Sequence, residues 1–203
     1  MVAFCSFICF TMQLCFATNN VHKLKEIKAL LGDNFELKTL QEIGCSEELP
    51  ETTDTIEGNS AQKAEYVSEH YGVNCFADDS GLEIEALNGA PGVHSAYYSG
   101  ERNHNRNIER VLSKLANKSN RKARFKTVIT LTLDGQSHSF EGIVKGIIID
   151  APRGTDGFGY DPIFIPEGDN RTFAEMTLDE KSKISHRSRA FAKLVAFLQN
   201  YSG

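Results

Sequence analysis

The chain has 203 residues, of which 40% are hydrophobic and 24% are charged, a composition typical of a folded globular protein. Its formal net charge of -5 argues against nucleic acid or an anionic membrane as a partner. The 5 cysteines are odd in number and contain no C-x-x-C pair, which favours a reducing cytoplasmic environment over a disulfide framework or a zinc site.

The first segment, Met1 to Thr11, is apolar and carries no charge. It lacks the positive region and the small-residue cleavage site of a secretory signal, and it is shorter than the ~20 residues that a membrane span needs. We therefore interpret residues 1–11 as an N-terminal extension that precedes the true start at Met12, and residues 12–203 as a single domain.

A strand over Leu14–Ala17 is expected to lead through the polar residues 18–20 into an amphipathic helix over His22–Leu31, which Gly32 ends. The amino end of a helix presents free N–H groups and a positive dipole, so this loop could bind phosphate, with Lys23 adding a formal charge. A solvated polar loop would have the same sequence pattern, and the chain contains no P-loop motif.

A second strand is expected over Phe35–Thr39, followed by an acidic loop over Gln41–Asp54 and a helix over Ile56–His70. The natural N-cap of that helix is Thr53 or Asp54. Acidic loops are usually solvated, so this one indicates no function by itself.

The third strand, Val73–Ala77, is followed by two adjacent carboxylates, Asp78 and Asp79, and then by Ser80 and Gly81. Because side chains alternate across a strand, both carboxylates can face the same way only if the strand has already ended. Two carboxylates at a strand tip suit a magnesium ion, although an Asx-turn with one solvated aspartate would give the same pattern.

A half-exposed strand is expected over Leu82–Leu87, because apolar residues alternate there with glutamates. A glycine-rich loop over Asn88–Gly100 could be a substrate lid or a subunit contact, and a helix follows over Asn103–Ala116. Two long strands, Ala123–Leu133 and Ser137–Ile149, are then joined by an Asp-Gly pair that predicts a two-residue hairpin. The sheet is therefore mixed rather than purely parallel.

The segment Pro152–Pro162 has glycines on both sides of Phe158. This arrangement lets the backbone approach a flat ligand while the ring stacks on it, but an ordered turn that buries Phe158 is an equal alternative. A capping box over Thr177–Glu180 then begins the last helical region. Its potential cations form either a local anion site or a solvated face; they are Lys181, Lys183, His186, Arg187 and Arg189.

Five motifs together resemble the inosine triphosphate pyrophosphatase family, whose members remove non-standard purine nucleotides. They are Thr18-Asn19-Asn20 with Lys23, Ala77–Leu82, Gly89–Gly92, Gly157–Pro162, and Glu180-Lys181 with Ser185–Arg187. The motifs occur in order from about residue 13 to the C-terminal helix, so the resemblance covers nearly the whole chain.

The resemblance implies an α/β fold with an elongated mixed β-sheet flanked by helices, two lobes and a central cleft. It implies a homodimer in which residues 12–203 form one nucleotide pyrophosphatase domain, and the cysteines, as noted above, favour a cytoplasmic location. The implied reaction is the Mg²⁺-dependent hydrolysis of inosine and xanthosine triphosphates (ITP and XTP) and their deoxy forms to the monophosphate and pyrophosphate.

By motif, the resemblance implies that Asp79 is the catalytic proton acceptor and, together with Glu51, a Mg²⁺ ligand. The substrate-binding residues that it implies are Thr18, Asn19, Asn20, Val21, His22, Lys23, Ser80, Phe158, Gly159, Tyr160, Asp161, Lys181, His186 and Arg187. Of these, Lys181, His186 and Arg187 carry hydrogen-bond donors that suit the 6-oxo group of hypoxanthine or xanthine and disfavour the 6-amino group of adenine.

Two positions depart from the resembled pattern. Tyr97 stands where many relatives of the resembled family carry arginine. Whether this chain makes the phosphate or dimer contact of that arginine is therefore left open. Gly58 replaces a more usual glutamate beside Asn59, and Glu57 could substitute for it. The alternatives to the expected enzyme are a pyrophosphatase of related fold with another base preference and a nucleotide sensor without turnover.

Overall fold

The structure is a computed structural model that describes residues 12–30 and 35–201. The extension expected over residues 1–11 and the helix end expected at Gly32 lie outside the described residues.

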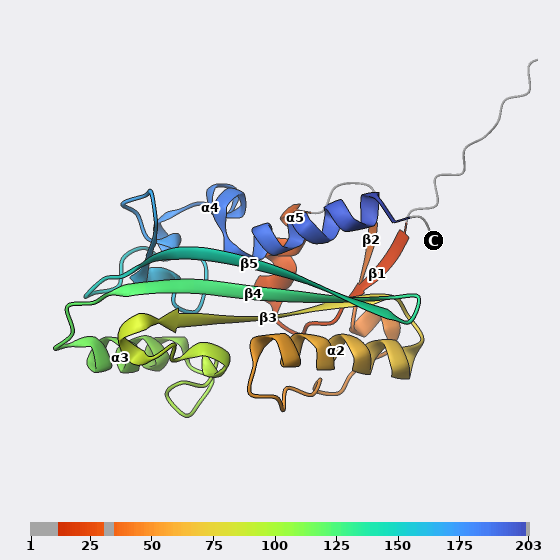
Figure 1. The fold of residues 1–203 in the computed structure, drawn as a ribbon, viewed down its shortest axis with the longest axis horizontal. Coiled ribbons are helices and arrows are strands. Elements are labelled where there is room, and N and C mark those ends of the chain that lie inside the picture. Colours follow the sequence, from red (N-terminus) through yellow and green to blue (C-terminus); the bar gives the residue numbers. More distant parts are fainter. Residues whose placement is uncertain (1–11, 31–34, 202–203) are drawn as a thin grey trace, which may run out of the picture.

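The described chain forms one mixed sheet of six strands in the order β2-β1-β3-β4-β5-β6. Figure 1 shows β3, β4 and β5 running along the long axis, with α4 and α5 on one side and α2 on the other. The expected elongated α/β fold is therefore confirmed. The strands are β1 (Met12–Phe16), β2 (Phe35–Thr39), β3 (Cys75–Ile84), β4 (Lys122–Leu133), β5 (Gln136–Ile148) and β6 (Phe164–Pro166).

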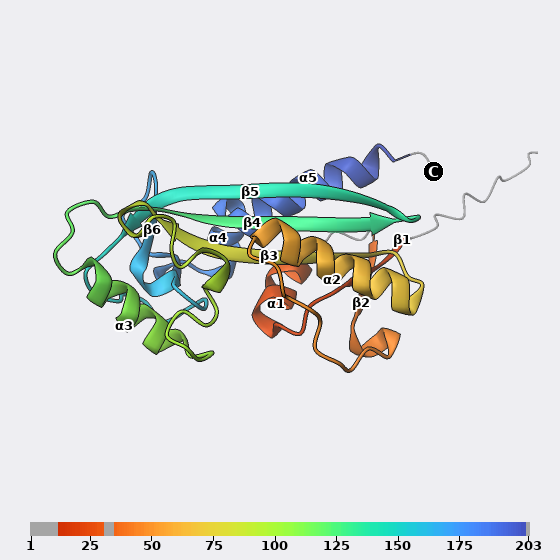
Figure 2. The same cartoon turned by 60° about the horizontal axis from the view of Figure 1, so that its bottom comes forward.

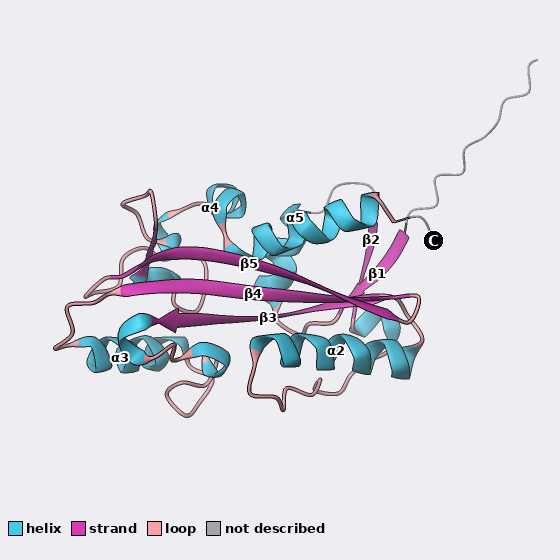
Figure 3. Cartoon of the chain, in the orientation of Figure 1, coloured by secondary structure: helices cyan, strands magenta, loops and turns pink. Residues whose placement is uncertain are grey.

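Helices account for most of the remaining regular structure, as the colouring of Figure 3 shows. They are α1 (Val21–Leu30), α2 (Ile56–Tyr71), α3 (His104–Leu115), α4 (Leu178–Ile184) and α5 (His186–Gln199). None of these helices has both the length and the apolar character needed to cross a membrane.

The β4–β5 hairpin confirms the local signal in the sequence. Asp134 and Gly135 both have positive φ, +49° and +78°, as a two-residue turn of this kind requires. The two strands pair antiparallel over their whole length, from Leu133 opposite Gln136 to Lys122 opposite Ile147.

Strand β3 is longer than expected. It runs without a break from Cys75 to Ile84, so the predicted strand end at Asp78 and Asp79 is wrong. Because the strand continues, the two carboxylates point to opposite faces of the sheet. The separate strand expected over Leu82–Leu87 is wrong as well, since β3 ends at Ile84 and a 3₁₀ turn follows over Glu85–Leu87.

Two helix boundaries also differ from expectation. The N-cap of α2 is Thr55, whose hydroxyl accepts a hydrogen bond from the Gly58 N–H, rather than Thr53 or Asp54. The last helical region is divided at Ser185, which ends α4 and caps α5 through the Ser188 N–H. The Thr177 capping box of α4 is confirmed.

The hydrophobic core is divided between the two ends of the sheet. One cluster lies around Leu82, Phe125 and Phe164 and includes α3 residues, whereas two others lie around Phe76 and α5 and around Cys75 and α2. Strands β3, β4 and β5 contribute to both ends, and Figure 2 shows them joining the two lobes.

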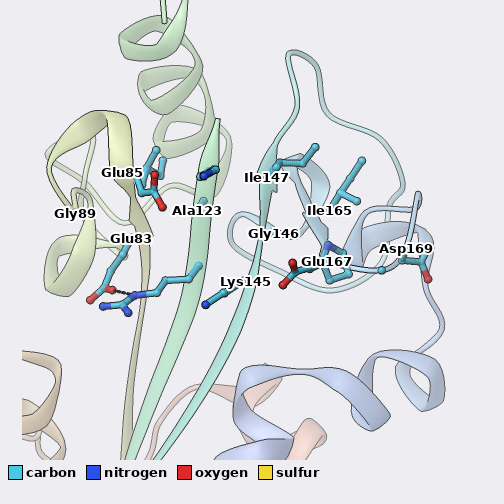
Figure 4. Close-up of a pocket in the computed structure, with 15 residues that line it drawn as sticks. Glu83, Glu85, Gly89, Ala123, Lys145, Gly146, Ile147, Ile165, Glu167 and Asp169 are labelled. Carbon is cyan, nitrogen blue, oxygen red and sulfur yellow. Dashed lines mark hydrogen bonds and ion pairs between the residues drawn. The ribbon is translucent and has the colours of Figure 1, made fainter. Parts of the chain in front are cut away.

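A hollow of about 770 Å³ lies on an outer face of β3–β6. Glu83, Arg124 and Lys145 are cross-strand neighbours on this face, which is opposite the one that buries Leu82 and Phe125. Figure 4 shows Glu83, Glu85, Lys145 and Glu167 around it, a mixture of charges with no predicted site residue among them.

Candidate active site

A smaller hollow of about 140 Å³ is lined by residues from both lobes. It contains every site residue predicted from the sequence except Thr18, Asn19, Val21 and His22. Thr18 and Asn19 line an adjoining hollow of about 150 Å³. Val21, which is 72% exposed, and His22 line neither.

Asp78 is fully buried and lies on the α1 and α5 side of β3. One of its carboxylate oxygens is 3.0 Å from the Lys23 Nζ, and the other accepts a hydrogen bond of 3.1 Å from the Arg187 Nε. Burial alone would raise the pKa of Asp78, but these two cations outweigh it and hold the pKa well below its usual range. Asp78 is therefore a charged partner that fixes two cations.

Asp79 lies on the opposite face, towards α2. Its carboxylate accepts hydrogen bonds from the Ser80 N–H at 2.9 Å and from the Asn59 amide at 3.5 Å, and it is 4.0 Å from the Lys63 Nζ. Burial raises the pKa of Asp79 in spite of Lys63 and Lys23. With weaker contacts than Asp78, this carboxylate is the one free to act on a ligand in the hollow.

Glu51 reaches the same place from the acidic loop. The Lys63 ammonium donates to the Glu51 carboxylate and, at 2.8 Å, to the Asp78 carbonyl oxygen, so it lies between Glu51 and Asp79. The described residues contain no cluster of three or more metal-binding side chains. Two carboxylates on one hollow nevertheless fit Mg²⁺, which commonly binds one or two carboxylates together with substrate phosphates.

On the other side of the hollow, Lys181 and Arg187 are held by a buried carboxylate, Glu26 of α1. The Lys181 Nζ donates to Glu26 and to Asp161, both at 2.7 Å, and the Arg187 guanidinium also donates to Glu26. Lys181 is 3% exposed and Arg187 is 1% exposed, so these cations do not form a solvated face. Burial would lower the pKa of each, but their acidic partners raise it, and both remain charged donors.

His186 is also buried, stacked at 4.6 Å between ring centroids on Phe125. Burial, and next the charges of Arg187 and Lys181, hold its pKa well below the usual value. The imidazole is therefore neutral near pH 7, and its Nδ1 has no hydrogen-bond partner in the described chain.

Phe158 connects the two lobes. Its ring stacks on His22 at 5.1 Å and 18°, and the Lys181 Nζ lies 5.1 Å from the ring centroid. The Phe158 N–H donates to Asp161, which fixes the glycine-rich turn. The turn is therefore ordered, as one of the two alternatives from the sequence expected, but it leaves Phe158 half-buried rather than buried. Stacking of Phe158 on a flat ligand stays a prediction.

The N–H groups at the start of α1 are less available to a phosphate than the sequence predicted. The Asn20 side chain accepts hydrogen bonds from the N–H groups of His22 and Lys23, at 3.0 and 3.3 Å. Two of the first N–H groups of the helix already have a partner and are not free to bind phosphate. The positive charge of this loop therefore comes mainly from Lys23.

Several polar residues of the site were not predicted as site residues from the sequence, among them Glu26, Asn59 and Lys63. Each lies on an amphipathic helix where a charged or amide side chain is usually solvated, and only their tertiary partners reveal them. Glu57 does not substitute at the site, because it pairs with Lys126. A Cβ on Gly58 would lie 2.4 Å from the Thr53 hydroxyl, so a larger residue does not fit there without movement.

Comparison with known proteins agrees with this geometry. A model of the Ham1 family matches residues 14–197. The chain belongs to the Ham1 family. The resemblance to inosine triphosphate pyrophosphatases, predicted from five motifs, is confirmed.

Two relatives of this Ham1 chain are named dITP/XTP pyrophosphatase. One, from Flavobacterium psychrophilum, is 52% identical over 190 residues, which cover 93% of this chain and 100% of the relative. The other, from Bacillus subtilis, is 46% identical and covers 90% of this chain and 95% of the relative. A solved structure, the Staphylococcus aureus Ham1 protein, is 38% identical, covers 92% of this chain and 98% of that one, and has a TM-score of 0.84.

Proposed function

We propose that this Ham1 protein hydrolyses non-standard purine nucleoside triphosphates, ITP, XTP and their deoxy forms, to the monophosphate and pyrophosphate. The observation that carries the proposal is the convergence of the Asp79 and Glu51 carboxylates, buried donors and the Phe158 ring on one hollow of about 140 Å³. The names of the relatives support the same reaction and the same substrates.

In this proposal Asp79 accepts a proton from the water that attacks the α-phosphorus. The bond from that phosphorus to the bridging oxygen breaks, and pyrophosphate leaves. The Ser80 N–H and the Asn59 amide orient the Asp79 carboxylate. Glu51 and Asp79 would hold Mg²⁺, which when bound neutralises phosphate charge and polarises the phosphorus. Lys23 and Lys63 supply further positive charge beside the phosphates.

Base selection rests on charged donors. Lys181 donates two of its three N–H bonds to Glu26 and Asp161, which leaves one for a ligand. A 6-oxo oxygen can accept it, whereas the 6-amino group of adenine would place a donor against a donor. Phe158 supplies the aromatic face on which the base stacks.

The test is pyrophosphate release from ITP, XTP, ATP and GTP with Mg²⁺ and the full chain. We expect turnover of ITP and XTP at rates at least tenfold above ATP. Comparable rates on all four would overturn the assigned specificity, and tight ITP binding without release would identify a sensor instead.

Three further properties belong to the proposal. We infer Mg²⁺ dependence from the Asp79 and Glu51 pair, to be tested by chelation and re-addition. We infer a homodimer from the family resemblance, to be tested by light scattering. A cytoplasmic location is supported by the free, buried thiols of Cys15, Cys45 and Cys75.

A further inference from the structure

Arg102 lies at the boundary of the two hollows that make up the cleft. Both hollows share Asn20, Lys23, Glu51, Tyr97 and Arg102. The hollows are therefore adjacent, and Arg102 lies where the base side of the cleft meets the Thr18–Lys23 side.

The other cations of the cleft already have carboxylate partners. Lys23 is paired with Asp78, Lys63 with Glu51, and Lys181 and Arg187 with Glu26. In the described part of the chain, the Arg102 guanidinium makes no hydrogen bond or ion pair, and its aromatic neighbour is Tyr97. Arg102 is thus the cleft cation whose five N–H donors all remain available.

The Arg102 side chain is exposed and lies beside one aromatic ring. Its guanidinium carbon lies 5.7 Å from the centroid of the Tyr97 ring, a distance that allows a cation–π contact. The Arg102 charge also affects two neighbours. Burial raises the pKa of Glu51, but Lys63, Lys23 and then Arg102 lower it. Burial lowers the pKa of His104, and His22 and Arg102 lower it further. The aromatic face of Tyr97 thus lies beside the guanidinium of an arginine five residues later in the chain.

We propose that Arg102 binds the triphosphate of the substrate, as a planar donor fork that takes two phosphate oxygens at once. This inference rests on the proposed function and adds a substrate-binding residue to it. Arginine suits the task because its fixed fork matches phosphate geometry and its charge does not titrate. Lys23 and Lys63 are each paired with a carboxylate, so Arg102 adds a positive charge to the cleft without giving up another partner.

The experiment measures the affinity of the full chain for inorganic tripolyphosphate by calorimetry. Arg102→Gln is expected to weaken binding by about tenfold or more, and inosine binding is expected to stay unchanged. Tyr97→Phe keeps the ring and should bind as the unmodified protein does, whereas Tyr97→Ala should weaken tripolyphosphate binding severalfold.

A matched control is available on α3. Arg110 lies 5.7 Å over the ring of Tyr98 in the same kind of contact, but it lines neither hollow. Arg110→Gln should therefore leave the tripolyphosphate affinity unchanged. Equal affinity in Arg102→Gln and the unmodified protein, or an equal loss in Arg110→Gln, would overturn the inference.

The two proposals can fail separately. If the protein binds tripolyphosphate through Arg102 but releases no pyrophosphate from ITP, the proposed function fails and the role of Arg102 stands. If ITP is hydrolysed and Arg102→Gln binds tripolyphosphate normally, the role of Arg102 alone is overturned. No tripolyphosphate binding by the unmodified protein contradicts the inference directly.

Discussion

At the scale of single residues, the adjacent carboxylates of β3 have different environments and should respond differently to the loss of charge. Asp78 is surrounded by cations, whereas Asp79 receives an amide N–H and faces the hollow. A carboxylate that pairs buried cations mainly affects folding, and one that faces a ligand mainly affects turnover.

We therefore predict that Asp79→Asn lowers kcat for ITP by about 10²–10⁴-fold and leaves the free energy of unfolding nearly unchanged. Asp78→Asn should instead destabilise the fold by about 3–5 kcal/mol, because Lys23 and Arg187 lose their buried partner. Steady-state kinetics and urea unfolding of both variants check this. Full activity in Asp79→Asn, or an unaltered stability in Asp78→Asn, would contradict the assignment.

Glu26 offers a prediction about pH. Burial would raise its pKa, but Arg187 and Lys181 lower it from 4.5 to about 2 in the folded state. The stability that this carboxylate contributes is complete above its unfolded pKa and is lost as the pH falls towards the folded value. A pKa lowered by this amount corresponds to about 3 kcal/mol of folding free energy.

The stability difference between the unmodified protein and Glu26→Gln should therefore be largest above about pH 4.5 and shrink as the pH falls towards 2. Urea unfolding at several pH values measures it, with Glu65→Gln, a substitution at an exposed position of α2, as the control. A difference that stays constant across this range would mean that Glu26 does not hold the two cations electrostatically.

Residue types and motifs predicted much of the candidate site, since Asp79, Phe158, Lys181 and Arg187 all line one hollow. The same reasoning missed Glu26 and Lys63, whose side chains are charged and lie on amphipathic helices. Their role depends on partners that are distant in the sequence: Glu26 meets residues 181 and 187, and no local pattern encodes that contact.

At the scale of elements, the position of α5 depends on a glycine in β5. A Cβ on Gly142 would lie 2.0 Å from the His186 carbonyl oxygen and 2.5 Å from the Ala190 N. The first turn of α5, which carries His186 and Arg187, therefore contacts the backbone of β5 directly.

We predict that Gly142→Ala moves this turn away from the sheet, costs about 1–3 kcal/mol of stability, and raises KM for ITP severalfold. Gly146→Ala is a matched control in the same strand, because its Cβ would lie 2.1 Å from the Ile165 carbonyl oxygen, on β6 rather than α5. It should lose comparable stability with a smaller change in KM. Equal KM changes in the two variants would show that α5 is not placed by Gly142.

Most elements were predictable because their signals are local. The β4–β5 hairpin follows from Asp134 and Gly135, and α4 from its capping box. The predicted end of the third strand was wrong. Carboxylates normally mark strand ends, whereas Asp78 and Asp79 lie in the middle of β3. Cations from α1, α2 and α5 stabilise them there, and that compensation is tertiary.

At the scale of the whole molecule, the stack of Phe158 on His22 crosses the cleft between the lobes. A purine that stacks on the face of Phe158 now covered by His22 must displace the imidazole. The contact therefore competes with the base, although His22 was expected to bind the triphosphate.

Removal of this competitor should strengthen substrate binding. We predict that His22→Ala lowers KM for ITP by about 2–10-fold, the worth of one aromatic contact, whereas Phe158→Ala raises it. A higher KM in His22→Ala would instead support a triphosphate contact. Steady-state kinetics with ITP, and tripolyphosphate affinity as the base-free comparison, distinguish the two roles.

The two lobes and the cleft were expected only through the family resemblance, since periodicity predicts elements but not how far a sheet extends. The structure adds that β3, β4 and β5 pass through both lobes without interruption. The lobes are therefore joined by hydrogen-bonded strands rather than by a linker.

This continuity limits how the protein can admit its substrate. A hinge needs a few residues that absorb large φ/ψ changes between rigid bodies, and three paired strands offer none. The moving parts must be the segments that border the sheet, above all residues 152–162 with Phe158 and the start of α1 with His22. Hydrogen exchange of these segments should slow when nucleotide binds, while the centre of β4 remains protected throughout.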